Sequence, residues 1–196
     1  MGKRKAYRAA LVGATAMGLL VAGYGSAQGS AAEQPGKAAQ HSKTEAGTYP
    51  GEFESTLRLS DGRRVHARLV EGKGLQERHQ AAGATKWSAW QTLYKTAEDR
   101  CQGVKLAEVE GTVSLIADFG QYCYDGEPPT ESLAGVGTGD LSDWDLKMTE
   151  DFDGWKDTSI ADDGSRVLFI YDSDSGLFYL RWEQSEGFSE VHFPEE

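Results

Sequence analysis

The chain has 196 residues, with 20 Lys or Arg against 31 Asp or Glu and a formal net charge of -11. This length is typical of a single domain, and the 39% of hydrophobic residues is enough for a globular core, which excludes a chain that is disordered throughout. The acidic balance argues against nucleic acid as a partner, because binding to phosphates needs positive charge facing the ligand.

Residues 1–27 have the three-part pattern of a secretory signal peptide. Met1 to Arg8 is basic, residues 9–23 form an apolar run, and residues 25–27 are small. The run is shorter than the roughly 20 residues of a membrane-spanning helix. We expect a secreted, extracellular protein, cleaved after Ala27 or, as the second choice, after Ala32, with no stable membrane insertion after processing. An uncleaved N-terminal anchor is the alternative.

Residues 28–47 are rich in Ala, Gly, Ser, Gln and Lys and contain no aromatic residue. Such a composition cannot bury enough apolar surface to offset the entropy of ordering the chain. We interpret this stretch as a flexible linker, so that the folded domain is expected at residues 48–196.

Within that domain, alternating polar and apolar residues predict β-strands, and glycine-containing turns separate them. The pairs Asp61-Gly62, Glu110-Gly111 and Asp163-Gly164 are hairpin signals, because glycine supplies the positive φ that tight turns need. The flanking strands are expected at 56–59 and 65–69, at 104–107 and 113–117, and at 160 and 167–171. A last hairpin is expected with strands at 169–171 and 177–182 and a turn at 172–176.

The turn glycines Gly62, Gly111 and Gly164 are 49 and 53 residues apart. A period near 50 built on short strands is typical of propeller blades of about four strands each. Three such units cannot close a propeller of four or more blades. The sequence predicts an all-β fold of antiparallel hairpins in blade-like repeats of about 50 residues, as a partial propeller or one closed by oligomerisation. A β-sandwich is the alternative.

Cys101 and Cys123 lie on either side of the hairpin that turns at Gly111. In an exported chain with two cysteines a disulfide is expected, and a small bulge would bring the pair into register. The competing interpretation is a catalytic thiol, but no histidine lies near either cysteine in the sequence.

The sequence contains no metalloprotease, zinc, phosphate-loop or serine-hydrolase motif, so no catalytic residue is assigned. Acidic residues are frequent in the second half, where residues 101–196 hold 22 acids and 5 bases. Asp172 and Asp174 stand on alternate positions before Gly176, as calcium loops begin, although the EF-hand spacing fails. Bound calcium or solvated turn acids are the two interpretations. Loop acids are also the groups from which a carboxylate pair for glycoside hydrolysis would come.

Tryptophans are the candidate ligand-binding residues. Trp87 and Trp90 are three positions apart, so on a strand they would point to opposite faces, one in the core and one available to stack on a sugar ring. The alternative is that both are buried. Trp144 and Trp182, in the other two units, are the further candidates.

The segment from Asp61 to Arg68, followed by Trp87-Ser88-Ala89-Trp90-Gln91-Thr92-Leu93, resembles the repeat of propeller lectins of the fucose-binding and tectonin type. Residues 174–182 with 187–191 form a second partial match, and residues 172–179 are similar to the Asp-box turn of sialidase-like propellers. In those propellers the box is a structural turn, so it implies no sialidase activity. The middle unit, with its two cysteines, departs from the pattern. The resemblance implies propeller blades and sugar binding.

Three hypotheses on function follow. The first is a secreted, non-enzymatic module that binds carbohydrate or another cell-envelope component. The second is a small secreted hydrolase that uses loop carboxylates. The third is a protein-interaction or inhibitor domain whose acidic face meets a basic partner. The expected partner is thus an extracellular glycan or protein, and the sequence does not indicate an oligomeric state.

Overall fold

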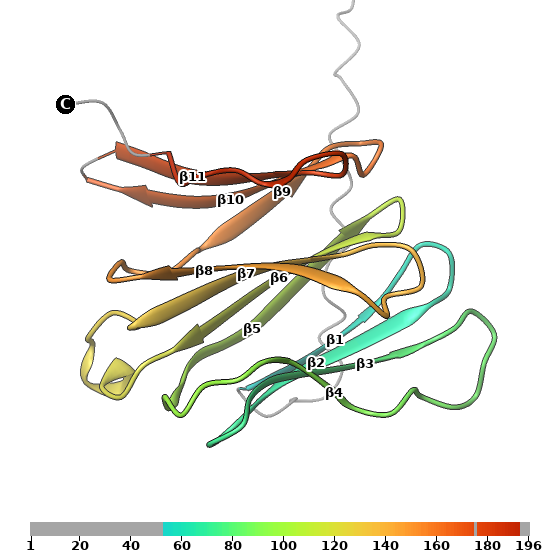
Figure 1. Ribbon diagram of the computed structural model, residues 1–196, viewed down its shortest axis with the longest axis horizontal. Helices are drawn as coiled ribbons and strands as arrows, with labels where there is room; N and C mark the ends of the chain where they lie inside the picture. The colour runs from blue at the N-terminus through green and yellow to red at the C-terminus, as the bar shows by residue number, and fades with distance from the viewer. Residues whose placement is uncertain (1–52, 175, 193–196) are drawn as a thin grey trace, which may run out of the picture. The chain divides into compact units, whose positions relative to one another are not determined.

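The computed structural model describes residues 53–174 and 176–192, so the predicted signal peptide (1–27) and linker (28–47) lie outside the described residues. Within these ranges the protein is all-β, with twelve strands in three four-stranded antiparallel sheets and one short 3-10 turn, η1 (Cys123–Asp125) (Figure 1). The same ranges hold no helix long and apolar enough to cross a membrane. The strands are β1 (Glu54–Arg58), β2 (Arg64–Val70), β3 (Gly74–Gln80), β4 (Gln91–Tyr94), β5 (Arg100–Val109), β6 (Thr112–Phe119), β7 (Glu131–Gly137), β8 (Trp144–Glu150), β9 (Asp157–Ile160), β10 (Arg166–Ser173), β11 (Gly176–Glu183) and β12 (Gly187–Phe188).

Each sheet is a meander of four consecutive strands: β1 to β4 form the first sheet, β5 to β8 the second and β9 to β12 the third. The predicted hairpin turns at Gly62, Gly111 and Gly164 are confirmed, and each joins the first two strands of its sheet. The spacing of these turns is therefore the spacing of the sheets along the chain. The last predicted hairpin is also confirmed, with pairing that continues to Ser173 and Gly176.

The sheets pack face to face through two hydrophobic clusters. Side chains such as Leu57 and Val65 of the first sheet meet Leu115 of the second. On the opposite face of the second sheet, Ile116 packs with Phe169 of the third. Every residue of β6 is buried, because both faces of its sheet are covered. The protein therefore has three stacked sheets, whereas the β-sandwich alternative would have two.

Hydrogen bonds at the first turn of each sheet connect one sheet to the next. Ser60 Oγ donates to the buried Glu108 carboxylate (2.8 Å), and Thr112 Oγ1 donates to the Gly164 carbonyl (2.9 Å). A Cβ at Gly164 would lie 2.8 Å from Thr112 Oγ1, so both the close approach and the φ of +70° require glycine. At the same edge, β1 and β2 contact β5, while β5 and β6 contact β9.

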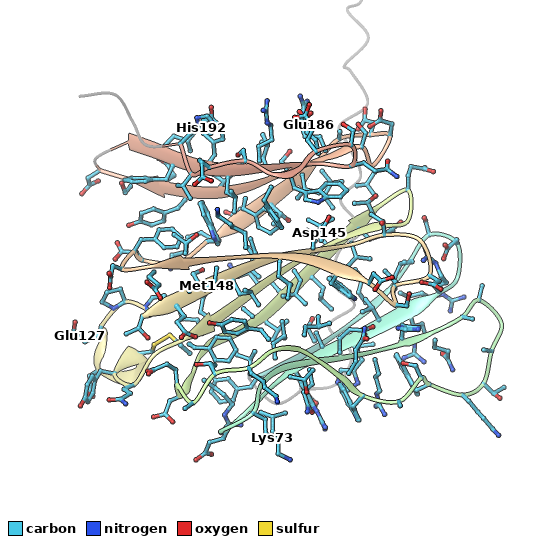
Figure 2. All side chains as sticks on the ribbon, viewed as in Figure 1. Lys73, Glu127, Asp145, Met148, Glu186 and His192 are labelled. Atoms are coloured by element: carbon cyan, nitrogen blue, oxygen red, sulfur yellow. A yellow bond between two sulfur atoms is a disulfide. The ribbon has the colours of Figure 1, made fainter. Side chains whose placement is uncertain are left out.

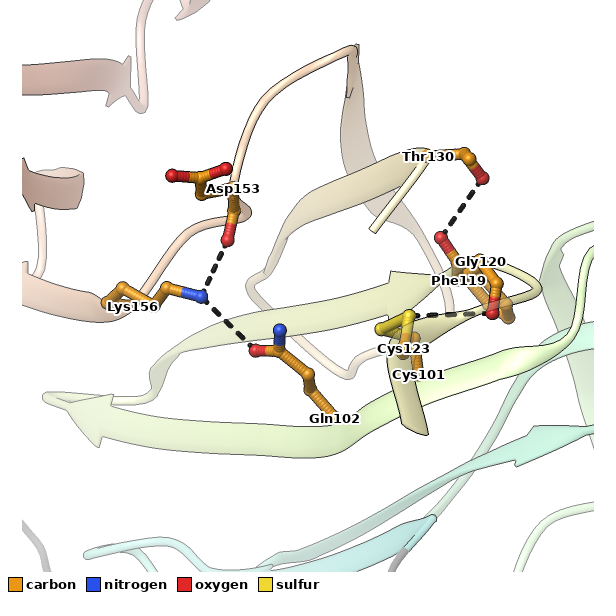
Figure 3. Close-up of a disulfide and its surroundings, with 8 residues drawn as sticks. All are labelled: Cys101, Gln102, Phe119, Gly120, Cys123, Thr130, Asp153 and Lys156. Carbon is orange, nitrogen blue, oxygen red and sulfur yellow. Dashed lines mark hydrogen bonds between the residues drawn. A yellow bond between two sulfur atoms is a disulfide. The ribbon is translucent and has the colours of Figure 1, made fainter. Parts of the chain in front are cut away.

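The predicted disulfide between Cys101 and Cys123 is confirmed, with Cα atoms 5.6 Å apart (Figure 3). It joins the start of β5 to η1. The register of β5 against β6 shifts between Cys101 and Val104, which is the bulge that the pairing needs. Within this bulge, Gln102 accepts a hydrogen bond from Lys156 of the segment before β9 (3.2 Å), which ties the second sheet to the entry of the third.

Candidate functional site

The face of the first sheet that points away from the second sheet is lined by arginine. Along β2, Val65 and Ala67 enter the core, so that Arg64, His66 and Arg68 lie on the opposite face. The register adds side chains from the neighbouring strands, because cross-strand partners share a face. We call this surface the arginine face; it comprises Glu54, Thr56, Arg58, Arg64, His66, Arg68, Gln76, Arg78, Gln80 and Thr92, together with Trp87 and Trp90.

The connection from β3 to β4 brings both tryptophans onto this face. The Ser88 N–H donates to the His79 carbonyl (2.7 Å), and the His79 N–H donates to Ser88 Oγ (2.9 Å). The ring centroids of Trp87 and Trp90 then lie 5.9 and 5.0 Å from that of His66. The prediction that the two indoles point to opposite faces is wrong, because residues 87–90 form a loop and β4 begins only at Gln91.

Guanidinium groups alternate with the two indole rings. The Arg68 guanidinium lies 3.7 Å from the Trp90 ring centroid, and that of Arg78 lies 4.5 Å from Trp90 and 4.9 Å from Trp87. Arg64 lies 5.0 Å from the Trp87 centroid. These are cation–π contacts, which hold flexible side chains in defined positions. Both indoles are half-buried, so each keeps part of its surface in solvent.

His66 lies at the centre of the arginine face and acts there as a neutral acceptor. Its Nδ1 accepts from Arg78 (3.1 Å), and its Nε2 lies 3.3 Å from a carboxylate oxygen of Glu54. This pattern places the ring proton on Nε2. Burial lowers the pKa of His66, the hydrogen bond with Glu54 raises it, and the charge of Arg78 lowers it further. The imidazole is therefore uncharged at neutral pH.

The arginine face continues across the sheet into a shallow hollow. Arg68 donates to the side-chain oxygen of Gln76 (2.9 Å), and the Gln76 amide donates to Thr92 Oγ1 (3.4 Å). Thr92 lines a hollow of about 450 Å³ that also presents two lysines, one of which, Lys73, is labelled in Figure 2. We call it the lysine hollow; it is lined by Gly72, Lys73, Thr92, Lys95, Thr96 and Ala97.

The charge of the chain is divided between its segments. Residues 53–97, which form the first sheet, contain eight Lys or Arg and four Asp or Glu. Residues 98–192, which form the second and third sheets, contain 22 Asp or Glu and six Lys or Arg. The arginine face is thus a positive surface in an otherwise acidic protein, and net charge alone does not reveal it.

The other predicted tryptophan sites lie in packing positions. Trp182 is 2% exposed, and its Nε1 donates to Asp145 of the second sheet (2.7 Å; Asp145 is labelled in Figure 2). Trp144 packs against Gly137, and its Nε1 donates to the Leu141 carbonyl (3.2 Å). The structure therefore places Trp182 in the core rather than at a ligand site, and it gives Trp144 a structural contact.

The predicted calcium ligands lie at the hairpin between β10 and β11. Asp172 is an exposed residue of β10, and Asp174 is an exposed residue of the turn that follows. Among residues 53–174 and 176–192, no group of three or more His, Cys, Asp or Glu side chains is placed to hold a metal ion. A calcium site at Asp172 and Asp174 stays a prediction.

Loop carboxylates gather in a separate pocket of about 500 Å³ near the disulfide. Its aromatic wall is Phe152 with Tyr122, which is 63% exposed, and Asp153 on its rim accepts a hydrogen bond from Tyr171. Four loop carboxylates of the kind that the hydrolase hypothesis invokes line this pocket: Asp125, Glu127, Asp151 and Asp153.

The sequence analysis did not identify the arginines of the arginine face as candidate ligand-binding residues, although the alternation along β2 indicated them. Arg64, His66 and Arg68 alternate with Val65 and Ala67, which already places three basic or aromatic side chains on one face of a strand. The contact of these side chains with Trp87 and Trp90 depends on the path of a loop, which alternation does not describe.

On the arginine face, the first sheet and the loop between β3 and β4 hold aromatic and charged groups together. In comparisons with known proteins, no family model matches the chain, and neither the curated proteins nor the solved structures give a match.

Proposed function

We propose that this protein is a secreted, non-enzymatic binding module, and that the arginine face holds its ligand, a carbohydrate or another component of the cell envelope. The observation that carries the proposal is the pair of half-buried indoles, Trp87 and Trp90, held on one face among three guanidinium groups. An indole offers a flat apolar surface for a sugar ring, and guanidinium offers several N–H donors in a fixed fork.

Each of the four cation–π contacts adds only a little stability. A cation–π contact at an exposed site contributes only about 0.5–1 kcal/mol, and three guanidinium groups on one face repel one another. The contacts instead preorganise the surface, because Trp90 is fixed by Arg68 and Arg78 and its loop is fixed by Ser88. A preorganised surface loses less side-chain entropy when it binds.

The covalent structure supports an extracellular location. Disulfides form and persist in oxidising compartments, and Cys101 and Cys123 are paired. The predicted signal peptide at residues 1–27 agrees with that location.

The three sheets form an open, propeller-like stack in this proposal. Each is a four-stranded meander, and hydrogen bonds at equivalent turns join them, as repeated blades would be joined. Closing a ring would bury the arginine face against another sheet. Burying several unpaired charges is costly, so the first sheet acts as an end of the stack and its outer face stays open to a ligand.

A glycan array with neutral and acidic glycans, probed with the purified protein with and without calcium, tests the proposal. Trp87→Ala and Trp90→Ala should each lower binding to the best array ligand at least tenfold while the melting temperature changes little. Tyr122→Ala, which removes an exposed aromatic residue elsewhere, is the matched control and should bind like the wild type. Unchanged binding by both tryptophan variants would overturn the proposal.

A further inference from the structure

We infer that the ligand of the arginine face is a linear acidic polysaccharide, a chain of sugars with carboxylate groups, which runs across the first sheet from the two tryptophans to the lysine hollow. The inference rests on the proposed function of the same face and names its ligand class. Its support is the unpaired charge of the arginines, the continuity of the surface and the charge of the remaining protein.

Among the described residues, the arginines of this face outnumber its carboxylates, although the chain is rich in acids. Within residues 53–174 and 176–192, the arginines that form ion pairs are Arg63, Arg100 and Arg181, whereas Arg64, Arg68 and Arg78 form none. The nearest acidic side chain in the hydrogen-bond pattern, Glu54, is bonded to His66 instead. Three fixed guanidinium groups beside a single carboxylate, Glu54, leave this face net positive and form a site for an anionic ligand, because guanidinium binds carboxylate through two parallel hydrogen bonds.

The surface is longer than one sugar ring. It is continuous from Trp90 to Arg68, from Arg68 to Gln76, and from Gln76 to Thr92 at the edge of the lysine hollow. This path crosses three neighbouring strands, β2, β3 and β4, which are about 4.8 Å apart, so it spans roughly 10 Å. A ligand that contacts both the indoles and Lys73 in the hollow must therefore be an oligomer.

The charge of the other sheets favours a polysaccharide over nucleic acid. The 22 acids of residues 98–192 repel any dense polyanion that approaches the protein. Duplex DNA carries one charge per about 1.7 Å of its axis, whereas an acidic polysaccharide carries at most one carboxylate on each uronic acid. A sugar chain also supplies apolar ring faces between its charges, which matches guanidinium groups that alternate with indoles.

The two ends of the surface should contribute in different ways. Short oligomers should occupy the indoles and Arg68 alone, and longer oligomers should add Lys73 and Lys95 in the lysine hollow. Linking a second contact to a first raises affinity through effective concentration. Affinity should therefore rise with chain length until the oligomer reaches the hollow.

The test is titration of the protein with galacturonate, mannuronate and glucuronate–N-acetylglucosamine oligomers of two to ten sugars, followed by calorimetry. Methyl-esterified galacturonate oligomers are the uncharged control and should bind at least tenfold more weakly. The variant Arg68→Gln/Arg78→Gln should lose at least tenfold in affinity for all lengths, and Lys73→Gln/Lys95→Gln should lose only the gain with length. Arg166→Gln, on the third sheet, removes an exposed charge elsewhere and should behave like the wild type.

The outcomes separate this inference from the proposed function. If neutral glycans bind through Trp90 and none of the acidic oligomers binds, the inference is wrong and the binding module stands. If no glycan binds and the tryptophan variants change nothing, both are wrong. Tighter binding of a single-stranded DNA 20-mer, or a dimer that dissociates in the Arg68→Gln/Arg78→Gln variant, would assign the face to nucleic acid or to a second copy. If the arginine variant does not fold, the esterified oligomers and the lysine variant still decide the question.

Discussion

Replacing the buried Asp118 with Asn should stabilise the protein at neutral pH. Asp118 is 2% exposed on β6 and faces the third sheet. Its carboxylate accepts a hydrogen bond from Ser132, whose hydroxyl oxygen accepts a hydrogen bond from the backbone N–H of Trp155 (3.0 Å). Burial raises the pKa of Asp118 from 3.8 to about 6, although the Ser132 hydrogen bond and the charges of Lys156 and Lys105 lower it.

The size of the effect follows from this pKa. The unfolded chain releases the Asp118 proton near pH 3.8 and the folded protein near pH 6, so the folded state binds more protons between these values. The stability that depends on a neutral Asp118 carboxyl is therefore fully present below about pH 4 and is lost as the pH rises through about 6. The loss at pH 7 is about 3 kcal/mol, of which roughly 1.3 kcal/mol returns at pH 5. Asn carries no such charge, so the variant should not show this loss.

The assay is urea unfolding of wild type and Asp118→Asn at pH 5, 6 and 7, followed by tryptophan fluorescence. The advantage of the variant should be about 1.3 kcal/mol larger at pH 7 than at pH 5. Asp163→Asn is the control, since hydrogen bonds from Ser165 lower the pKa of this exposed carboxyl and its contribution is constant in that range. An Asp118→Asn advantage that does not change between pH 5 and 7 would refute the reasoning.

Three further predictions concern packing and covalent structure. The double variant Cys101→Ala/Cys123→Ala should lose roughly 3 kcal/mol of unfolding free energy, and an unchanged urea midpoint would contradict this. Trp182→Ala should cost about 3–5 kcal/mol because it empties a core position, whereas a loss below 1 kcal/mol would show that the side chain is not packed. Gly164→Ala should lower the melting temperature by several degrees, because its Cβ would lie 2.8 Å from Thr112 Oγ1, and this decrease should be smaller when both proteins compared carry Thr112→Ala if that contact is the cause.

Local signals predicted the hairpins, and the missed strands lack such signals. The turns at Gly62, Gly111 and Gly164 depend on the backbone freedom of single residues, which a sequence displays directly. Strand β7 contains Gly135 and Gly137, and few of its residues have high β-propensity. It is a strand because its neighbours fill the space above these glycines: a Cβ at Gly137 would lie 2.8 Å from the Trp144 ring.

The arginine face was predictable in part. Trp87 and Trp90 are identified as candidates by their type, and the alternation of β2 places Arg64 and Arg68 on one face. The orientation of the indoles was not predictable, because it depends on hydrogen bonds between the loop and His79 of β3. Tertiary contacts of this kind override the strand pattern from which opposite faces were expected.

The complete burial of β6 has a consequence for the order in which the chain is made. A nascent chain that ends at residue 150 can pair its second sheet, but Ile116, Ala134 and Val136 then have no third sheet to cover them. The covering strands end at residue 188, so synthesis at about 5–20 residues per second leaves this apolar face open for roughly 2–8 s. An open apolar face favours aggregation, so a factor that delays folding until the last strand is available would protect the chain.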